Sequence, residues 1–87
     1  MYALNFSGKA NNFLKKLDRH ILLRVLDRLE NLKVNPVPSD AVFIGREDGE
    51  KVFRYRVGDY RALYKFKESE QVILVAKIDK RPRVYDK

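Results

Sequence analysis

The chain has 87 residues, a length typical of one small domain, which we predict to span residues 1–87. It contains no cysteine and one histidine, His20, so the sequence excludes a disulfide framework and a thiolate metal site, and we expect no metal or other cofactor. Its formal net charge of +7 favours a polyanionic partner, and without a signal pattern or a long apolar run we expect a cytoplasmic protein with no membrane span.

The first part of the chain predicts a short strand followed by two helices. Residues 2–6 (YALNF) have the composition of a strand, and residues 7–18 read as a helix whose first turn Ser7 can cap. In residues 19–35 apolar side chains recur at helical spacing, and Asp18 can cap this second helix. One long helix is the alternative to a helical hairpin. The Asn-Pro-Val-Pro that follows ends the helix, because proline cannot continue it.

The remaining residues predict strands, because they are rich in β-branched and aromatic side chains separated by turn sequences. The four predicted strands span residues 40–45, 51–57, 60–66 and 71–78. The order of elements predicts an α+β fold, in which the helices cover one face of a small, twisted, mostly antiparallel sheet.

The Gly58-Asp59 pair predicts a two-residue hairpin loop and therefore fixes a register. In that register Arg56 faces Arg61 and Val52 faces Lys65. Because side chains alternate between the faces of a sheet, one face of the hairpin carries apolar and aromatic groups. These are Phe53, Tyr55, Val57, Tyr60, Ala62 and Tyr64. The opposite face carries Arg54, Arg56, Arg61, Lys65 and Lys67, with Val52 and Leu63 among them.

This second face is predicted to hold charge of one sign, with no acidic residue on either strand to neutralise it. Like charges directly opposite each other, as in Arg56 and Arg61, destabilise a strand pair. Ordinary solvated faces mix positive and negative charge. We therefore interpret the face as an anion-binding site, the alternative being a solvated outer surface.

The last nine residues, DKRPRVYDK, extend the basic character to the end of the sequence. They include Lys80, Arg81, Arg83 and Tyr85, beside a proline that weakens strand pairing. Guanidinium groups bind phosphate oxygens through two hydrogen bonds, and a tyrosine ring can stack on a base. The alternative is a disordered, charged terminus.

Over nearly its whole length the sequence resembles the RelE/ParE superfamily of toxin–antitoxin toxins. The resemblance rests on KKLDRHI in the helical pair, on the hairpin RYRVGDYRALY and on the ending KIDKRPRVY, which is similar to the RelE branch in particular. It implies the microbial-RNase-like RelE fold and a toxin that cleaves mRNA in the ribosomal A site without a metal. In the reaction that the resemblance implies, the ribose 2′-hydroxyl attacks the adjacent phosphate, and translation is inhibited.

The resemblance also implies roles for individual residues. Arg61 matches the family arginine after the hairpin turn, and Arg54 matches a basic position before it. Arg81 matches the carboxy-terminal arginine, which serves as the acid or stabilises the leaving group, and Tyr85 matches the terminal aromatic residue, which stacks on a base. A second family lysine, two residues before Arg54, is Val52 in this chain.

The substitution at Val52 leaves the proton acceptor of the reaction unassigned. Arginine is a poor general base because its pKa exceeds 12. A lysine among other cations has a lowered pKa, so we hypothesise that Lys65, directly across from Val52, partly replaces the missing lysine as a catalytic residue. Lys65 as part of the electrostatic surface is the alternative. The remaining candidates, for RNA binding, are Arg56, Lys67, Lys80 and Arg83.

Two other functions fit the same residues: inhibition of DNA gyrase in the manner of the ParE branch, and binding to the ribosome or its RNA without cleavage. For either toxin reading the resemblance implies a partner, a RelB-like, acidic antitoxin that wraps around the toxin in a heterodimer or heterotetramer. The predicted cationic face gives a physical reason for such a partner, because an acidic segment would relieve its repulsion.

Overall fold

In the computed structural model residues 1–80 are described, and this part of the chain contains two α-helices and five strands. In chain order the elements are β1 (Ala3–Phe6), α1 (Gly8–Lys15), α2 (Arg19–Glu30), a 3-10 turn (Asn31–Lys33), β2 (Val42–Glu47), β3 (Glu50–Val57), β4 (Tyr60–Lys67), a second 3-10 turn (Glu68–Glu70) and β5 (Val72–Lys80). The predicted α+β order is confirmed, with boundaries displaced by a few residues. Neither helix is long and apolar enough to cross a membrane.

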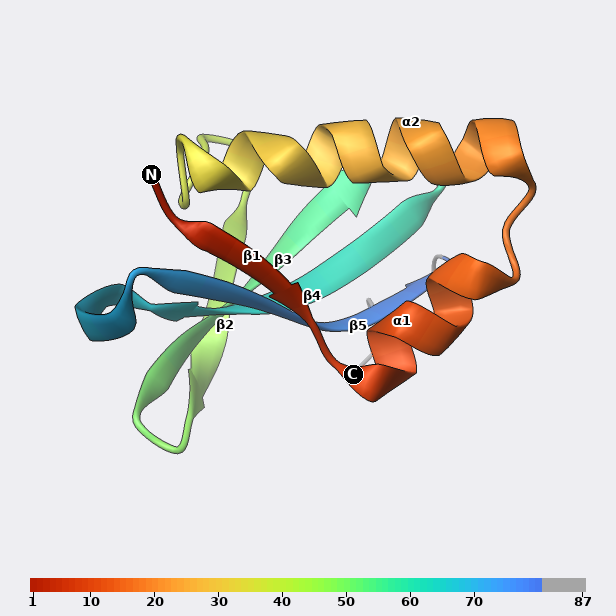
Figure 1. The fold of residues 1–87 in the computed structure, drawn as a ribbon. Helices are drawn as coiled ribbons and strands as arrows, with labels where there is room; N and C mark the ends of the chain where they lie inside the picture. The colour runs from red at the N-terminus through yellow and green to blue at the C-terminus, as the bar shows by residue number, and fades with distance from the viewer. Residues whose placement is uncertain (81–87) are drawn as a thin grey trace.

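The strands form one mixed sheet in the order β1-β5-β4-β3-β2. Strands β2 to β5 are antiparallel to their neighbours, whereas β1 runs parallel to β5. Both helices lie on the same side of this sheet, α1 beside β5 and α2 across β3 (Figure 1). The other side, which we call the outer face, is not covered by these helices.

The helical hairpin is confirmed, and the N-termini of its two helices are capped differently. The Ser7 hydroxyl accepts a hydrogen bond from the backbone N–H of Ala10 at 3.0 Å, and it donates one to the carbonyl of Ala76 in β5 at 2.7 Å. At α2 the predicted side-chain cap is wrong: Asp18 occupies the N-cap position but makes no side-chain cap bond. Only its carbonyl takes part, accepting from the N–H of Leu22 at 2.8 Å.

The core lies between the helices and the sheet. Its fully buried members of largest volume are Tyr55, Tyr64, Leu29, Leu32, Ile73 and Val75. The rings of Phe53 and Tyr64 stack with centroids 5.5 Å apart, and the Tyr64 hydroxyl donates to the carbonyl of Pro36. Burial raises the pKa of Tyr64, so this hydroxyl stays protonated as a donor. The prediction that the aromatic side of the hairpin faces the core is confirmed.

Candidate nucleic-acid interface

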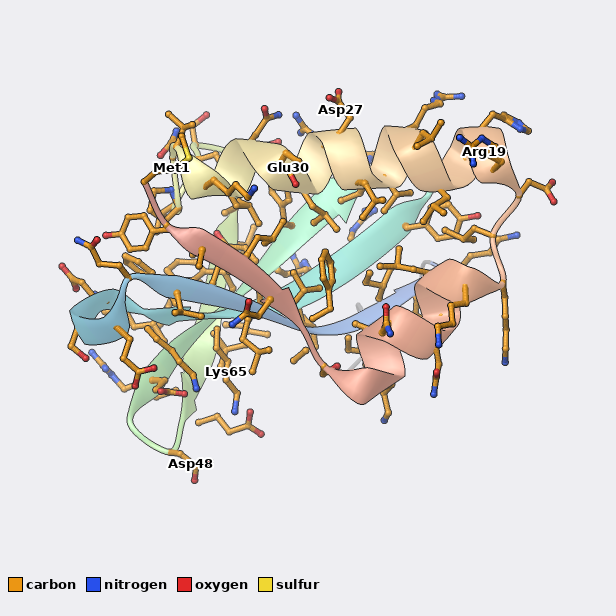
Figure 2. The ribbon with its side chains drawn as sticks, in the orientation of Figure 1. Met1, Arg19, Asp27, Glu30, Asp48 and Lys65 are labelled. Carbon is orange, nitrogen blue, oxygen red and sulfur yellow. The ribbon has the colours of Figure 1, made fainter. Side chains whose placement is uncertain are left out.

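The β3–β4 hairpin has the register predicted from its loop. Arg56 pairs with Arg61, and Val52 pairs with Lys65. Gly58 has φ of +64°, the positive value that the first loop position of such a turn requires. Because paired residues share a face, the five hairpin cations lie together on the outer face, from Arg54 to Lys67. Lys65 points away from α2 (Figure 2).

Arg61 differs from the other cations of this face in its burial. It is only 6% exposed, whereas Arg56 beside it is exposed. Charged side chains are almost never buried to this degree unless they are paired. One of its contacts is a hydrogen bond from Nη1 to the carbonyl of Tyr60 at 3.4 Å. Arg61 is therefore held in a defined position in a site of reduced solvent access.

The prediction that no acidic residue neutralises this face is wrong at one end of the hairpin. Strand β3 begins at Glu50, one residue earlier than predicted, and Glu50 has the same parity as Val52. Its carboxylate lies 3.8 Å from Nζ of Lys67. Glu47, at the end of β2, places Oε1 2.9 Å from Nζ of Lys65. The outer face is thus ion-paired near Lys65 and Lys67, and a third carboxylate, that of Asp79 in β5, is opposite Arg61 in the strand register.

The expectation of a lowered pKa for Lys65 is also wrong. The hydrogen bond that Lys65 donates to the Glu47 carboxylate is the main cause that raises the pKa of Lys65 above its usual 10.5, and burial opposes this only in part. The repulsion from neighbouring arginines was expected to dominate. The nearest charge is instead a carboxylate, which favours the charged ammonium. Lys65 is accordingly a stable cation in this structure.

Replacing Glu47 with glutamine is expected to lower the pKa of Lys65 toward 10.5, as measured by NMR titration of the lysine side-chain carbons. Since the folded-state pKa of Lys65 lies above that of an unfolded lysine, the pair stabilises the fold below about pH 10.5 and loses this effect as the pH rises through the folded value. In the control Glu68→Gln the titration of Lys65 is expected to stay unchanged. An unchanged pKa in Glu47→Gln would contradict the assignment.

Strand β5 adds one cation to the outer face that the sequence pattern did not reveal. The β4–β5 register shifts next to Tyr64, so that Leu63 pairs with Lys77 while Tyr64 pairs with Val75. This bulge reverses the alternation in the rest of the strand. Lys77 consequently lies on the outer face. Lys80, predicted to bind RNA, is instead opposite Tyr60, on the side of the sheet that carries the helices.

The three other predicted tail residues, Arg81, Arg83 and Tyr85, lie outside the described residues. Their roles remain predictions from the sequence.

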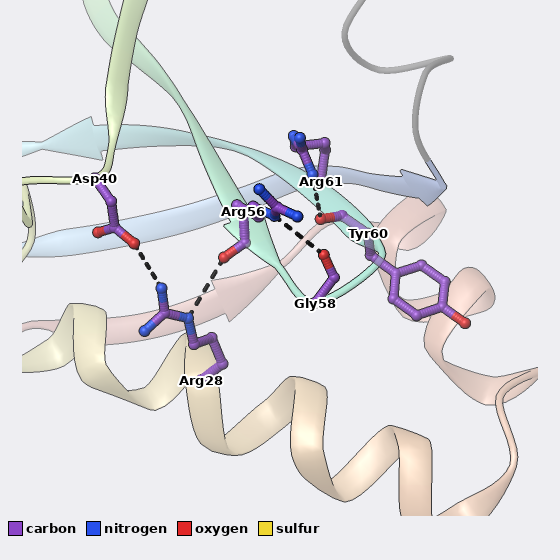
Figure 3. A network of polar contacts seen from close by, with 6 residues as sticks. All are labelled: Arg28, Asp40, Arg56, Gly58, Tyr60 and Arg61. Atoms are coloured by element: carbon purple, nitrogen blue, oxygen red, sulfur yellow. Dashed lines mark hydrogen bonds and ion pairs between the residues drawn. The ribbon is translucent and has the colours of Figure 1, made fainter.

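An arginine of helix α2 supports the hairpin from the opposite side (Figure 3). Arg28 pairs with the Asp40 carboxylate and donates from Nε to the carbonyl of Arg56 at 3.4 Å. Its guanidinium carbon lies 4.8 Å from the ring centroid of Tyr55. Arg56 in turn donates from Nε to the carbonyl of Gly58 at 3.4 Å. Nothing in the sequence singled out Arg28, because its partners are distant along the chain.

A groove of about 690 Å³ lies between α2 and the hairpin loop. Its lining includes Arg24 and Arg28 but also Asp27 and Asp59, and it contains His20. The cations of this groove therefore lie among carboxylates, which weakens its attraction for a phosphate. We assign no catalytic role to His20, which lies in α2, away from the outer face.

Two comparisons of the sequence with known proteins indicate the same family of toxins. The sequence profile of the family described as the ParE toxin of type II toxin–antitoxin systems, parDE, matches residues 4–85. A protein of Methanocaldococcus jannaschii that carries the name toxin RelE1 is 33% identical over 73 residues, which are 83% of this chain and 81% of that protein.

Solved structures show the same fold. The archaeal RelE–RelB complex from Pyrococcus horikoshii includes a chain that matches with a TM-score of 0.82 and 26% identity, over 94% of this chain and 97% of the other. The toxin–antitoxin complex RelBE2 from Mycobacterium tuberculosis matches with a TM-score of 0.76 and 26% identity, over 92% and 98% of the two chains.

Proposed function

This chain belongs to the RelE/ParE superfamily and is a toxin of a type II toxin–antitoxin system, and on that premise we propose that it cleaves mRNA in the ribosomal A site. The observation that carries the proposal is the row of arginines on the outer face, Arg54, Arg56 and Arg61, with Arg61 buried in place. A preorganised guanidinium stabilises the charge that develops on a phosphate during attack by the 2′-hydroxyl.

In the proposed mechanism the residues divide between substrate binding and stabilisation of the transition state. Arg54 and Arg61 hold the scissile phosphate, and Lys65 adds positive charge beside them. Arg56, Lys67 and Lys77 bind neighbouring phosphates of the mRNA. Family resemblance supports Arg81 as the group that stabilises the leaving 5′-oxygen and Tyr85 as the ring that stacks on a base. Arg83 is proposed to bind RNA, whereas Lys80 is less suited to do so, given its position opposite Tyr60.

Inhibition of DNA gyrase is the second candidate function. It is favoured by the description of the matching family as a ParE toxin and by Val52, which stands where RelE-type toxins carry a lysine. Purified toxin added to translating ribosomes separates the candidates. Codon-specific cuts in mRNA support the nuclease, whereas DNA breaks trapped on gyrase support the inhibitor. Sedimentation with ribosomes and intact mRNA would instead indicate a binding protein without catalysis.

We propose further that a RelB-like antitoxin neutralises this toxin, as the RelE–RelB complexes of its structural relatives suggest. Strand β2 lies at the edge of the described sheet, and we propose that an antitoxin strand pairs with that edge. Three consecutive apolar residues there, Val42, Phe43 and Ile44, are 44%, 53% and 46% exposed. An edge strand with exposed apolar side chains can pair with a strand of another chain through its unpaired backbone groups. Acidic antitoxin side chains reaching the outer face would also pair with its arginines.

The substitution Ile44→Asp is expected to weaken binding of the antitoxin encoded beside the toxin gene by about tenfold or more, because it places a charge in an apolar contact. Isothermal titration calorimetry measures the affinity. The control is Leu23→Asp, on the exposed side of α2, where the side chain is 51% exposed. Equal weakening by both substitutions, or by neither, would contradict a β2 docking site.

A further inference from the structure

The loop end of the β3–β4 hairpin extends past the end of strand β2. Pairing between β2 and β3 stops at Val42 and Arg54, so among residues 1–80 no strand neighbours the last residues of β3 on that edge. Val57 and Tyr60 form the pair next to the two-residue loop, and the backbone groups of Arg56 therefore point away from β4. The carbonyl of Arg56 is thus left for a partner that is not a strand.

Arg28 of helix α2 is this partner. Its Nε donates to the Arg56 carbonyl at 3.4 Å, and its guanidinium carbon lies 4.8 Å from the ring centroid of Tyr55. Nη2 of the same guanidinium pairs with the carboxylate of Asp40, two residues before β2. One side chain therefore joins three segments, which are α2, the end of β3 and the residues that lead into β2 (Figure 3).

The charges at the loop end of the hairpin explain why Arg28 is itself paired. Arg56 and Arg61 are directly opposite each other, and their repulsion works against the strand pair. An unpaired Arg28 would add a third positive charge on the other side of the same strand. Because the Asp40 carboxylate neutralises that charge, Arg28 can hold the Arg56 carbonyl without adding to the repulsion.

The contacts of Arg28 contribute orientation more than stability. The side chains of Arg28 and Asp40 are 41% and 48% exposed, and ion pairs this open to water add little to the stability of a fold. The backbone position of Arg56, however, determines where its paired residue Arg61 presents a guanidinium. A misplacement of about 1 Å at a catalytic group can lower a rate by about 10²-fold.

We propose that Arg28, held by Asp40, is a positioning residue of the cleavage site; this inference rests on the proposed function. Arg28 lies on the helix side of the sheet, so it does not contact an mRNA bound to the outer face. It acts through the backbone of Arg56 and through Arg61, which is proposed to hold the scissile phosphate.

The test compares Arg28→Gln with Arg24→Gln, which removes the same charge from α2 one turn earlier, at an exposed side chain that lines the same groove. On translating ribosomes Arg28→Gln is expected to cut a programmed mRNA about tenfold more slowly in a single turnover. Arg24→Gln is expected to cut at the rate of the parent. Sedimentation with ribosomes and the melting temperature are expected to be equal in the two variants, since each loses one charge and the ion pair of Arg28 adds little stability.

Coupling between substitutions shows whether Arg28 acts through the hairpin. In the background Arg61→Met, adding Arg28→Gln is expected to slow the residual cleavage by less than about twofold, because the group to be positioned is already absent. A second variant, Asp40→Asn, keeps the guanidinium but removes its anchor, and we expect it to cut about threefold more slowly than the parent. It decides the question if Arg28→Gln does not fold.

Three results would overturn the inference. They are cleavage at the parent's rate by Arg28→Gln and Asp40→Asn, equal slowing by Arg24→Gln, and a full tenfold loss in the Arg61→Met background. Weaker sedimentation of Arg28→Gln with ribosomes would also overturn it, because the residue would then affect binding rather than position. A parent that cuts no mRNA on ribosomes would instead refute the proposed function itself, which keeps the two failures apart.

Discussion

Replacing Arg61 with alanine is expected to lower the rate of mRNA cleavage on ribosomes by about 10³-fold, the largest effect we expect for a cation of the β3–β4 hairpin. Arg61 is 6% exposed, so its charge acts on the phosphate through a medium with little water. The charge of the exposed Arg56 is screened by water and salt. Arg56→Ala is therefore expected to lower the cleavage rate far less than Arg61→Ala does. Single-turnover cleavage of a programmed mRNA measures both rates.

Removal of a buried arginine can also disturb the fold, so a second variant is needed. Arg61→Met keeps most of the volume of the side chain and loses only its charge and hydrogen bonds, including the one to the Tyr60 carbonyl. We expect it to melt near the temperature of the parent and to be as inactive as Arg61→Ala. Cleavage by Arg61→Met within threefold of the parent would remove Arg61 from the catalytic residues.

Leu29→Ala is expected to lower the free energy of unfolding by about 2–5 kcal/mol, because it opens a cavity beneath helix α2. Leu29 is 0% exposed and packs in the core between α2 and the sheet. A domain of this size has only about 5–10 kcal/mol of stability, so the variant is close to unfolding at 37 °C. Urea denaturation followed by circular dichroism measures the change.

The matched control for this prediction is Leu23→Ala in the same helix. Leu23 is 51% exposed, and its truncation is expected to change stability by less than about 0.5 kcal/mol. A similar loss in both variants would mean that helix propensity, rather than packing under α2, determines the stability of this helix.

Local sequence signals predicted those parts of the fold that depend on neighbouring residues. The loop Gly58-Asp59 fixed the hairpin register because a two-residue turn permits only one alignment. Ser7 was a correct cap, because a side-chain oxygen three residues before a free N–H suffices for that bond. Alternation along β3 and β4 separated the aromatic core from the cations, so the position of the hairpin arginines on the outer face was predicted from the sequence.

What the sequence did not show depends on contacts between distant segments. The bulge in β5 opposite Tyr64 moves Lys77 to the outer face, and no residue in the sequence predicts this bulge. The turn between β2 and β3 is Asp48-Gly49, both at positive φ, which leaves Glu47 and Glu50 inside strands and beside lysines. Those carboxylates change the chemistry of the outer face, since they pair with the lysines at one end of it, and Asp79 of β5 adds a further carboxylate opposite Arg61.

The pairing of β1 with β5 determines when the toxin can fold during its own synthesis. Ala3 pairs with Val72, so the first strand to leave the ribosome needs the last described strand as its partner. The Ser7 cap has the same requirement, because its hydroxyl donates to Ala76. Such distant contacts form late, since a long loop must close first. A nascent chain that lacks β5 therefore has an incomplete sheet, and the ribosome that is making the toxin is exposed to the folded molecule only at the end of translation.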